Sequence, residues 1–342
     1  MRDALALPLV AAGLDGLLPA GLIWACQRLP NGAIRTLSKG DFGEALASRQ
    51  GWVWLHVDLV DQRAHSWIGD NCGLPDGVHA LLASHHEGLA LRHEAGVVHG
   101  ACADFHAELD HGFSGIGRLV FAVSEHLLVT GRRHTLSTPE ATRKALMAGA
   151  RPDTAFDLFG MLIGAFCQQV GEHLGGGNRQ LDEVEDRIVA GRISNERRTL
   201  MAVRRLALSI HRPVAALAAQ LHNEDRRAWD LPDAGHTTLH RLEHRLSELD
   251  RDVVTTNERA RLLQEELAAD LDEESNRSLR ALAVMSALLL PGTLIVGIFG
   301  MNTAGLPLAE TPGGFWIALG LTALATALFS LVLKRAGVKL RF

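Results

Sequence analysis

The tripeptide Gly300-Met301-Asn302 places oxygen atoms where they could hold a divalent cation. Mg²⁺ prefers oxygen ligands and gives up its bound water reluctantly. In an assembly of several copies, a ring of Asn302 amide oxygens and Gly300 carbonyl oxygens would hold a still-hydrated ion, and glycine lets backbones approach closely. Glycine and asparagine are also common at an ordinary helix C-terminus. The tripeptide therefore fits both a selectivity filter and a helix end.

Acidic residues recur at intervals of seven upstream of the tripeptide, at Glu258, Glu265 and Asp272. Seven residues are about two helical turns, so these carboxylates share one helix face. If several copies of the helix surround an axis, each position forms a ring of carboxylates in the lumen, and such rings concentrate divalent cations. The alternative is the solvated face of a coiled coil.

Histidine is frequent, with 17 residues, and His236, His240 and His244 follow one another at intervals of four. This spacing puts three imidazoles on one helix face, where they could bind zinc. A surface helix face without metal is the commoner meaning of such a set. The four cysteines include no CxxC pair, so the sequence predicts neither a disulfide framework nor a zinc ribbon.

Two further classes of function find no support in the sequence. It has no HExxH motif, no glycine-rich phosphate loop and no GxSxG motif, so we do not expect an enzyme. The formal net charge is -5, which gives no electrostatic reason to expect nucleic-acid binding.

Two apolar runs at the C-terminus must position the tripeptide. Residues 281–309 contain no charged side chain, and residues 281–302 are long enough to cross a bilayer as a helix. A second run, residues 314–333, follows a short loop that contains Glu310 and no lysine or arginine. Basic residues precede the first run and follow the second, so both termini are expected in the cytoplasm, most simply at a bacterial inner membrane.

The first span has a face of smaller and more polar residues. Steps of seven from Asn276 give Ala283, Leu290 and Gly297, and Thr293 lies on the same face. We expect the larger residues Leu282, Leu289, Ile295 and Phe299 on the opposite face. Small residues in a membrane helix indicate either close helix packing or the lining of an ion path.

The soluble region divides into an α/β part and a helical part. Short runs rich in Val, Ile, Leu and aromatic residues predict strands, at residues 21–29, 52–59, 89–99, 118–124 and 126–130. Helices are expected at 61–84, 138–149, 155–174, 179–190 and 195–223, with a break at Gly175-Gly176-Gly177. Residues 237–302 form one long helical pattern with an apolar seam, at Leu242, Leu246, Leu249, Val253, Ala260, Leu263, Leu267 and Leu271.

Two C-terminal spans, the first ending in Gly-Met-Asn after a long charged helix, resemble the CorA family of divalent-cation transport proteins. The matching residues are Asn276-Arg277, Leu290-Pro291 and residues 297–302. The resemblance implies a homopentameric funnel in the lipid bilayer. It combines an α/β N-terminal cytoplasmic domain with long stalk helices and two C-terminal transmembrane helices.

The expected organisation has seven segments. They are a cytoplasmic α/β domain (1–150), a cytoplasmic helical region (151–236), a stalk helix (237–280), the pore-lining span (281–302), a periplasmic loop (303–313), the second span (314–333) and a basic cytoplasmic tail (334–342). By the resemblance, the pore-lining positions are Asn276, Leu290, Thr293, Gly297 and Asn302. Leu290 would then form an apolar gate that blocks ions by dewetting.

The residues after the tripeptide bear on the transported ion. Residues 303–307 lack the bulky aromatic and the Met-Pro-Glu run of magnesium-type relatives and look more like the zinc-transporting ZntB branch. Zn²⁺ is therefore the favoured cargo, with Mg²⁺, Co²⁺, Ni²⁺ and Cd²⁺ as other candidates and no catalytic cofactor. The likeness to that branch implies proton coupling, which would have to use Glu310 or soluble histidines and acids, because residues 281–309 have no titratable side chain. Two alternatives stay open: a CorA-type Mg²⁺/Co²⁺ channel, and a membrane-anchored metal sensor or scaffold without transport.

Overall fold

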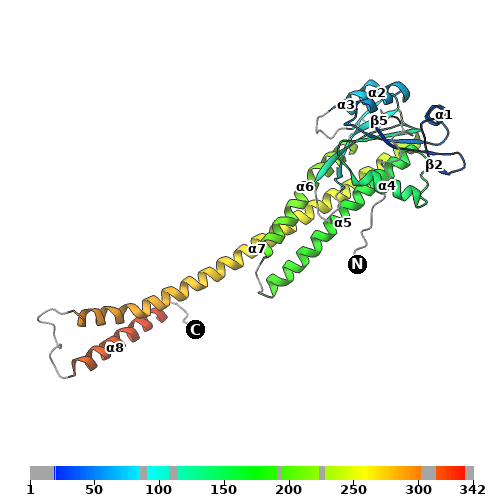
Figure 1. Cartoon of the computed structure of the whole chain (residues 1–342). Coiled ribbons are helices and arrows are strands. Elements are labelled where there is room, and N and C mark those ends of the chain that lie inside the picture. The colour runs from blue at the N-terminus through cyan, green and yellow to red at the C-terminus, as the bar shows by residue number, and fades with distance from the viewer. Residues whose placement is uncertain are drawn as a thin grey trace, which may run out of the picture. The chain divides into compact units, whose positions relative to one another are not determined.

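The structure is a computed structural model that describes residues 19, 21–84, 91–107, 115–191, 195–222, 228–301 and 313–335. The chain divides into two compact units, an N-terminal unit (Met1–Leu263) and a C-terminal unit (Gln264–Phe342). The predicted α/β domain, the long helix and the two C-terminal apolar helices are confirmed (Figure 1).

The N-terminal unit is built around a seven-stranded sheet with the order β2-β1-β3-β7-β6-β5-β4. Its strands are β1 (Leu22–Arg28), β2 (Ile34–Thr36), β3 (Val53–Asp58), β4 (Leu91–Glu94), β5 (Val97–Phe105), β6 (Ile116–Val123) and β7 (Leu127–Arg132). β3 and β7 pair in parallel, and the other neighbours pair antiparallel. All nine residues of β5 are buried, although His99 and Asp104 interrupt its apolar sequence.

Helices cover both faces of the sheet. Successive strand residues point to opposite faces, so Trp54 packs in one hydrophobic cluster and Leu55 in the other. The Leu55 face is covered by α1 (Phe42–Ser48), α2 (Gln62–Asn71) and α3 (Asp76–Ala83). The Trp54 face packs on α4 (Ser137–Met147), α5 (Ala155–Val189), α6 (Glu196–His222) and the first part of α7 (Asp233–Phe299).

Helix α5 differs from the prediction, because it continues through Gly175–Gly177 without a break. Gly177 is buried, and a Cβ at this position would lie 3.2 Å from Val203 Cγ1 on α6. The glycine therefore allows two helices to approach closely, and this packing offsets its low helix propensity. The single helix expected at 61–84 is also divided into α2 and α3, with Pro75 at the N-cap of α3.

A buried carboxylate joins β5 to α4. Asp104 Oδ1 accepts hydrogen bonds from the Phe105 N–H at 2.8 Å and from the Thr138 hydroxyl, and Asp104 Oδ2 accepts from the Thr138 N–H at 3.1 Å. The N-cap residue of α4 provides no side-chain hydrogen bond, so Asp104 takes this role from a distant strand. The Ser137 hydroxyl lies 3.2 Å from Asp104 Oδ1 and 2.6 Å from Gln169 Oε1, which extends the network to α5.

The apolar seam of α7 is largely as predicted. Leu242, Leu246, Leu249, Val253, Ala260, Leu263 and Leu267 are all buried. Leu271, which the spacing also assigned to the seam, is 45% exposed. The seam therefore ends one turn earlier than its pattern indicates.

In the C-terminal unit, α8 (Gly314–Arg335) runs antiparallel to the end of α7 (Figure 1). Among the residues of α8 whose burial is described, the half-buried ones are all small, at Gly314, Ala318, Thr322, Ala325, Thr326 and Ser330. A Cβ at Gly292 of α7 would lie 3.3 Å from Thr322 Cγ2, so the two helices are close at this point. Small residues at such spacing let membrane helices pack at short range.

Candidate functional site

Two helices of the described residues are long and apolar enough to cross a membrane, one in α7 and one in α8. No part of either apolar window is buried in the structure. The core helix of a soluble protein would be covered by other elements, whereas these surfaces need an apolar surrounding.

The predicted stripe of small and polar residues lies on a face of α7 that α8 does not cover. Asn276, Ala283, Leu290, Thr293 and Gly297 are all exposed, and Leu290 is 65% exposed. A Cβ at Gly297 would meet nothing within 4 Å, in contrast to Gly292. The small residues of this stripe therefore do not pack within the described chain.

The residues expected opposite the stripe divide into two pairs. Ile295 and Phe299 are half-buried, on the side of α7 that packs on α8. Leu282 and Leu289 are 58% and 67% exposed, so α8 does not cover them. The covered face is set by residues 284, 288, 291 and 295, whose spacing of three or four follows the helix period.

Thr293 shows how a polar side chain is accommodated on the exposed face. Its hydroxyl donates a hydrogen bond to the Leu290 carbonyl oxygen at 3.0 Å. The hydroxyl hydrogen of Thr293 is therefore donated within the helix, and the lone pairs of its hydroxyl oxygen remain free to accept hydrogen bonds. A face of this kind suits a hydrated cation, because the waters of a cation offer donors.

The chain leaves the α7 helix at the tripeptide. The Gly300 N–H donates to the Val296 carbonyl at 2.8 Å, and the Met301 N–H donates to the Ile298 carbonyl at 3.3 Å. A helix C-terminus has a partial negative charge, which favours a nearby cation. Asn302 and Glu310 lie outside the described residues.

The acidic positions Glu258, Glu265 and Asp272 are exposed on α7. Glu258 is not a free charge, because its Oε2 lies 3.0 Å from Arg261 Nε. Along the following turns, Arg277 likewise pairs with Glu273 at 3.2 Å. The acidic face thus alternates with arginines in the single chain, and this reduces its net field.

The three histidines are not assembled into a metal centre. The rings of His240 and His244 lie 4.5 Å apart, and His236 is half-buried one turn earlier. Within the part of the chain that the structure describes, no group of three His, Cys, Asp or Glu residues could hold a metal ion. The structure therefore gives no support to a three-histidine zinc site.

The sequence reasoning missed the small residues of α8 that hold the hairpin together. Ala318, Thr322, Thr326 and Ser330 follow one another at intervals of four. This spacing of small residues in an apolar run is the known signal for close packing of membrane helices. It would have separated the packed faces of the hairpin from the open one.

The fold and the two spans define a membrane protein with a large soluble α/β unit. The sequence profile of the family described as "CorA-like Mg2+ transporter protein" matches residues 49–335. The chain belongs to this family, and it is a divalent-cation transporter and not an enzyme. The resemblance noted in the sequence is thereby confirmed.

Curated relatives of the chain include transporters named for different cations. The divalent cation transporter CmaX of Pseudomonas aeruginosa is 28% identical over 278 residues, covering 78% of this chain and 81% of the relative. The zinc transport protein ZntB of Photorhabdus laumondii is 23% identical, covering 93% and 94%. The cobalt/magnesium transport protein CorA of Methanocaldococcus jannaschii is 25% identical, covering 46% and 50%.

Solved structures share the fold over nearly the full length. A structure of full-length CmaX superposes with a TM-score of 0.75 at 22% identity, covering 94% of this chain and 99% of that chain. The complete structure of the CorA magnesium transporter from Methanocaldococcus jannaschii gives a TM-score of 0.74 at 15% identity, covering 91% and 97%.

Proposed function

We propose that five copies of the chain assemble around an axis lined by α7 and conduct divalent cations along it. The supporting observation is the open face of α7 at Ala283, Leu290 and Gly297, which no residue of the described chain covers. Two helices have no interior, so a hydrated path through a bilayer needs several copies of the hairpin. The number five comes from the likeness to the CorA family.

In this assembly each predicted residue has a role. Asn302 and the Gly300 carbonyls form the filter at the outer mouth. Leu290 forms an apolar constriction that excludes ions when water leaves it. Thr293 and Asn276 offer oxygen atoms to the waters of the passing ion. Rings of Glu258, Glu265 and Asp272 attract cations at the cytoplasmic side.

Zinc is the cargo that we favour over magnesium. The ZntB relative aligns along 93% of this chain, whereas the CorA relative aligns along 46%. The residues after the tripeptide also lack the aromatic and Met-Pro-Glu run of magnesium-type relatives. A CorA-type Mg²⁺/Co²⁺ channel is the second candidate, and the CorA relative favours it.

The proposed location is a bacterial inner membrane with both termini in the cytoplasm. Arg277 and Arg280 precede the first span, and Lys334 and Arg335 follow the second. Positive residues stay on the cytoplasmic side of short membrane segments, so the tripeptide faces outward. Proton coupling would use Glu310 at the outer loop or histidines and acids of the soluble part, since residues 281–309 offer no titratable group.

Uptake of Zn²⁺ and Mg²⁺ into sealed vesicles that contain the purified protein tests this proposal. Each ion is measured with and without an inward proton gradient, for the wild type and for Asn302→Ala. We expect zinc uptake that the gradient accelerates and that Asn302→Ala abolishes, because the filter amide is lost. The matched control is Asn195→Ala, an exposed asparagine at the start of α6, which should leave uptake unchanged.

Other outcomes would redirect the proposal. Magnesium uptake that ignores the gradient would make the protein a CorA-type channel. An unchanged cation preference in Asn302→Ala would mean that the tripeptide is not the selectivity filter. Uptake of neither ion by folded, oligomeric protein would refute the proposed conduction path.

A further inference from the structure

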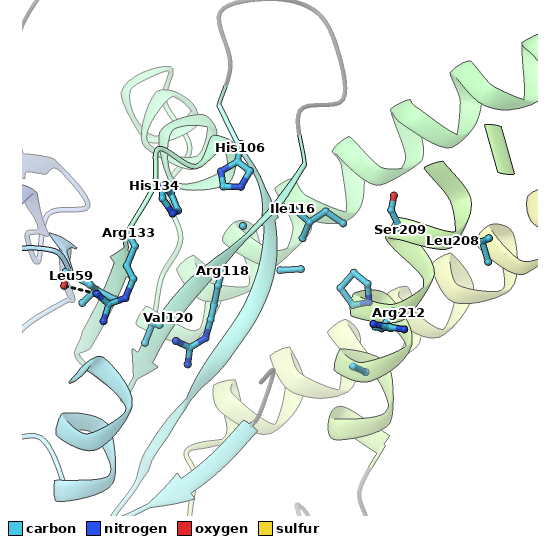
Figure 2. A pocket seen from close by; sticks show the side chains of 14 residues that line it. Leu59, His106, Ile116, Arg118, Val120, Arg133, His134, Leu208, Ser209 and Arg212 are labelled. Carbon is cyan, nitrogen blue, oxygen red and sulfur yellow. Dashed lines mark hydrogen bonds between the residues drawn. The ribbon is translucent and has the colours of Figure 1, made fainter. Parts of the chain in front are cut away.

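A pocket of about 770 Å³ lies between the sheet and α6, within the N-terminal unit (Figure 2). Its polar lining is strongly basic, with Arg118 on β6, Arg133 just after β7 and Arg212 on α6. His106 and His134 also line it, and their rings lie 5.5 Å apart. The transport path proposed above uses none of these residues.

The three guanidinium groups have no acidic partner among the described residues. No Asp or Glu lines the pocket, and no ion pair of the described chain involves Arg118, Arg133 or Arg212. Elsewhere in the same unit arginines do pair with acids, as Arg259 does with Asp182 at 2.7 Å. The pocket is therefore a concentration of positive charge that the described chain does not neutralise.

Backbone carbonyls hold two of the arginines in place. Arg133 Nη1 donates to the Leu59 carbonyl at 3.2 Å, and Arg118 Nη1 donates to the Ser84 carbonyl at 3.4 Å. The Nε–H groups of both arginines are buried and have no hydrogen-bond partner among the described residues. A buried donor without an acceptor is costly, so these groups are suited to an acceptor that enters the pocket.

The two walls of the pocket face each other with donors on both. Figure 2 shows Arg118 on the sheet, Arg133 just beyond the end of β7, and Arg212 across the cavity on α6. Burial, and after it the positive charge of Arg133, lower the pKa of Arg118. Gly117 leaves space for two neighbouring side chains, because a Cβ there would lie 2.7 Å from Leu136 Cδ2 and 2.9 Å from His106 Cε1.

We propose that this pocket binds a small-molecule anion with several phosphate groups, such as a nucleoside triphosphate. Guanidinium groups bind phosphate oxygens through paired N–H donors, and three of them on two walls match a chain of phosphates better than a single ion. The volume is that of a typical small-molecule site and far exceeds one phosphate. A carboxylate from a second copy of the chain is the competing occupant.

Calorimetric titration of the full-length protein in detergent tests the proposal. The probes are ATP and inorganic tripolyphosphate, both with EDTA present so that divalent cations do not contribute. We expect saturable binding of one anion per chain, at comparable affinity for the two probes if phosphate contacts dominate and tighter for ATP if the nucleoside also binds. Both results support the pocket.

Arg212→Glu is the decisive variant. Arg212 is exposed and makes no hydrogen bond or ion pair with the described residues, so its replacement should leave the fold intact. We expect affinity to fall at least about tenfold, since a charge-assisted contact becomes a repulsion. Arg197→Glu, about four turns earlier on the same helix, is the matched control and should bind as the wild type does.

Two results would overturn the proposal. One is the absence of saturable binding of either probe, which would favour a carboxylate from a second copy as the occupant. The other is equal affinity in wild type and Arg212→Glu, which would place any phosphate site elsewhere. Neither result depends on ion transport, so the pocket and the conduction path fail or stand separately.

Discussion

Replacing Asp104 with asparagine should remove a pH-dependent loss of stability from the N-terminal unit. Burial raises the pKa of the folded Asp104 carboxyl to about 6, against 3.8 for the ordinary side chain. Between these values the unfolded chain has released its proton and the folded chain still holds one, so stability falls as pH rises. A shift of roughly 2 units at about 1.36 kcal/mol per unit corresponds to about 3 kcal/mol, fully present below pH ~4 and lost above pH ~6.

The asparagine variant separates charge from geometry. Its carbonyl oxygen can still accept from the Phe105 N–H and the Thr138 hydroxyl, whereas the amide nitrogen now faces the Thr138 N–H. We therefore expect a constant destabilisation, about 1–2 kcal/mol at low pH, because the Thr138 N–H loses the 3.1 Å bond to Oδ2 and keeps only the 3.3 Å bond to Oδ1. The difference between wild type and variant should shrink or reverse as pH rises to 7.

Urea unfolding of the full-length protein in detergent, followed by tryptophan fluorescence from pH 4 to 7.5, measures this difference. Trp52 and Trp54 are buried in the same unit and report its unfolding. Asp70→Asn, at an exposed position on α2, is the control and should keep the wild-type pH dependence. Parallel stability curves for wild type and Asp104→Asn would refute the reasoning, because Asp104 would then be ionised in the folded chain as in the unfolded one.

The remaining predictions concern the hairpin. Leu290→Ala should raise ion leak in the vesicle assay, since a smaller side chain widens an apolar gate, and unaltered flux would place the constriction elsewhere. Gly292→Leu should lower the yield of assembled protein in size-exclusion chromatography, because a Cβ there already lies 3.3 Å from Thr322 Cγ2. Gly297→Leu, at an uncrowded position, should instead assemble normally and lose flux; equal assembly defects in both variants would contradict the two-face arrangement.

Elements with strong local patterns could be predicted from the sequence. The spacing of apolar residues in the strands and in the seam of α7 predicts which side chains are buried. In the seam, the prediction was wrong only for Leu271, which lies where the seam ends. The order of strands could not be predicted in this way. β3 pairs in parallel with β7 across a long stretch of sequence, and such pairing depends on tertiary packing and not on local propensity.

Glycine shows the same limit on a smaller scale. Three consecutive glycines predict a helix break, yet Gly177 lies inside α5 because α6 packs against its missing side chain. For the candidate site, a period of seven identified the open face of α7. The arginine pocket could not be found, since Arg118, Arg133 and Arg212 come from three elements that only the fold brings together.

The threonines of the two spans have a consequence for how the protein is made. Thr322 and Thr326 donate to carbonyls of their own helix at 2.8 and 2.9 Å, as Thr293 does on α7. The hydroxyl hydrogen of each threonine described in the spans is thus already hydrogen-bonded within its own helix when the helix enters the lipid. The small residues of α8 also let the two helices of the hairpin pack against each other. A newly synthesised chain can therefore settle in the bilayer alone, and the joining of copies becomes a later step that depends on protein concentration in the membrane.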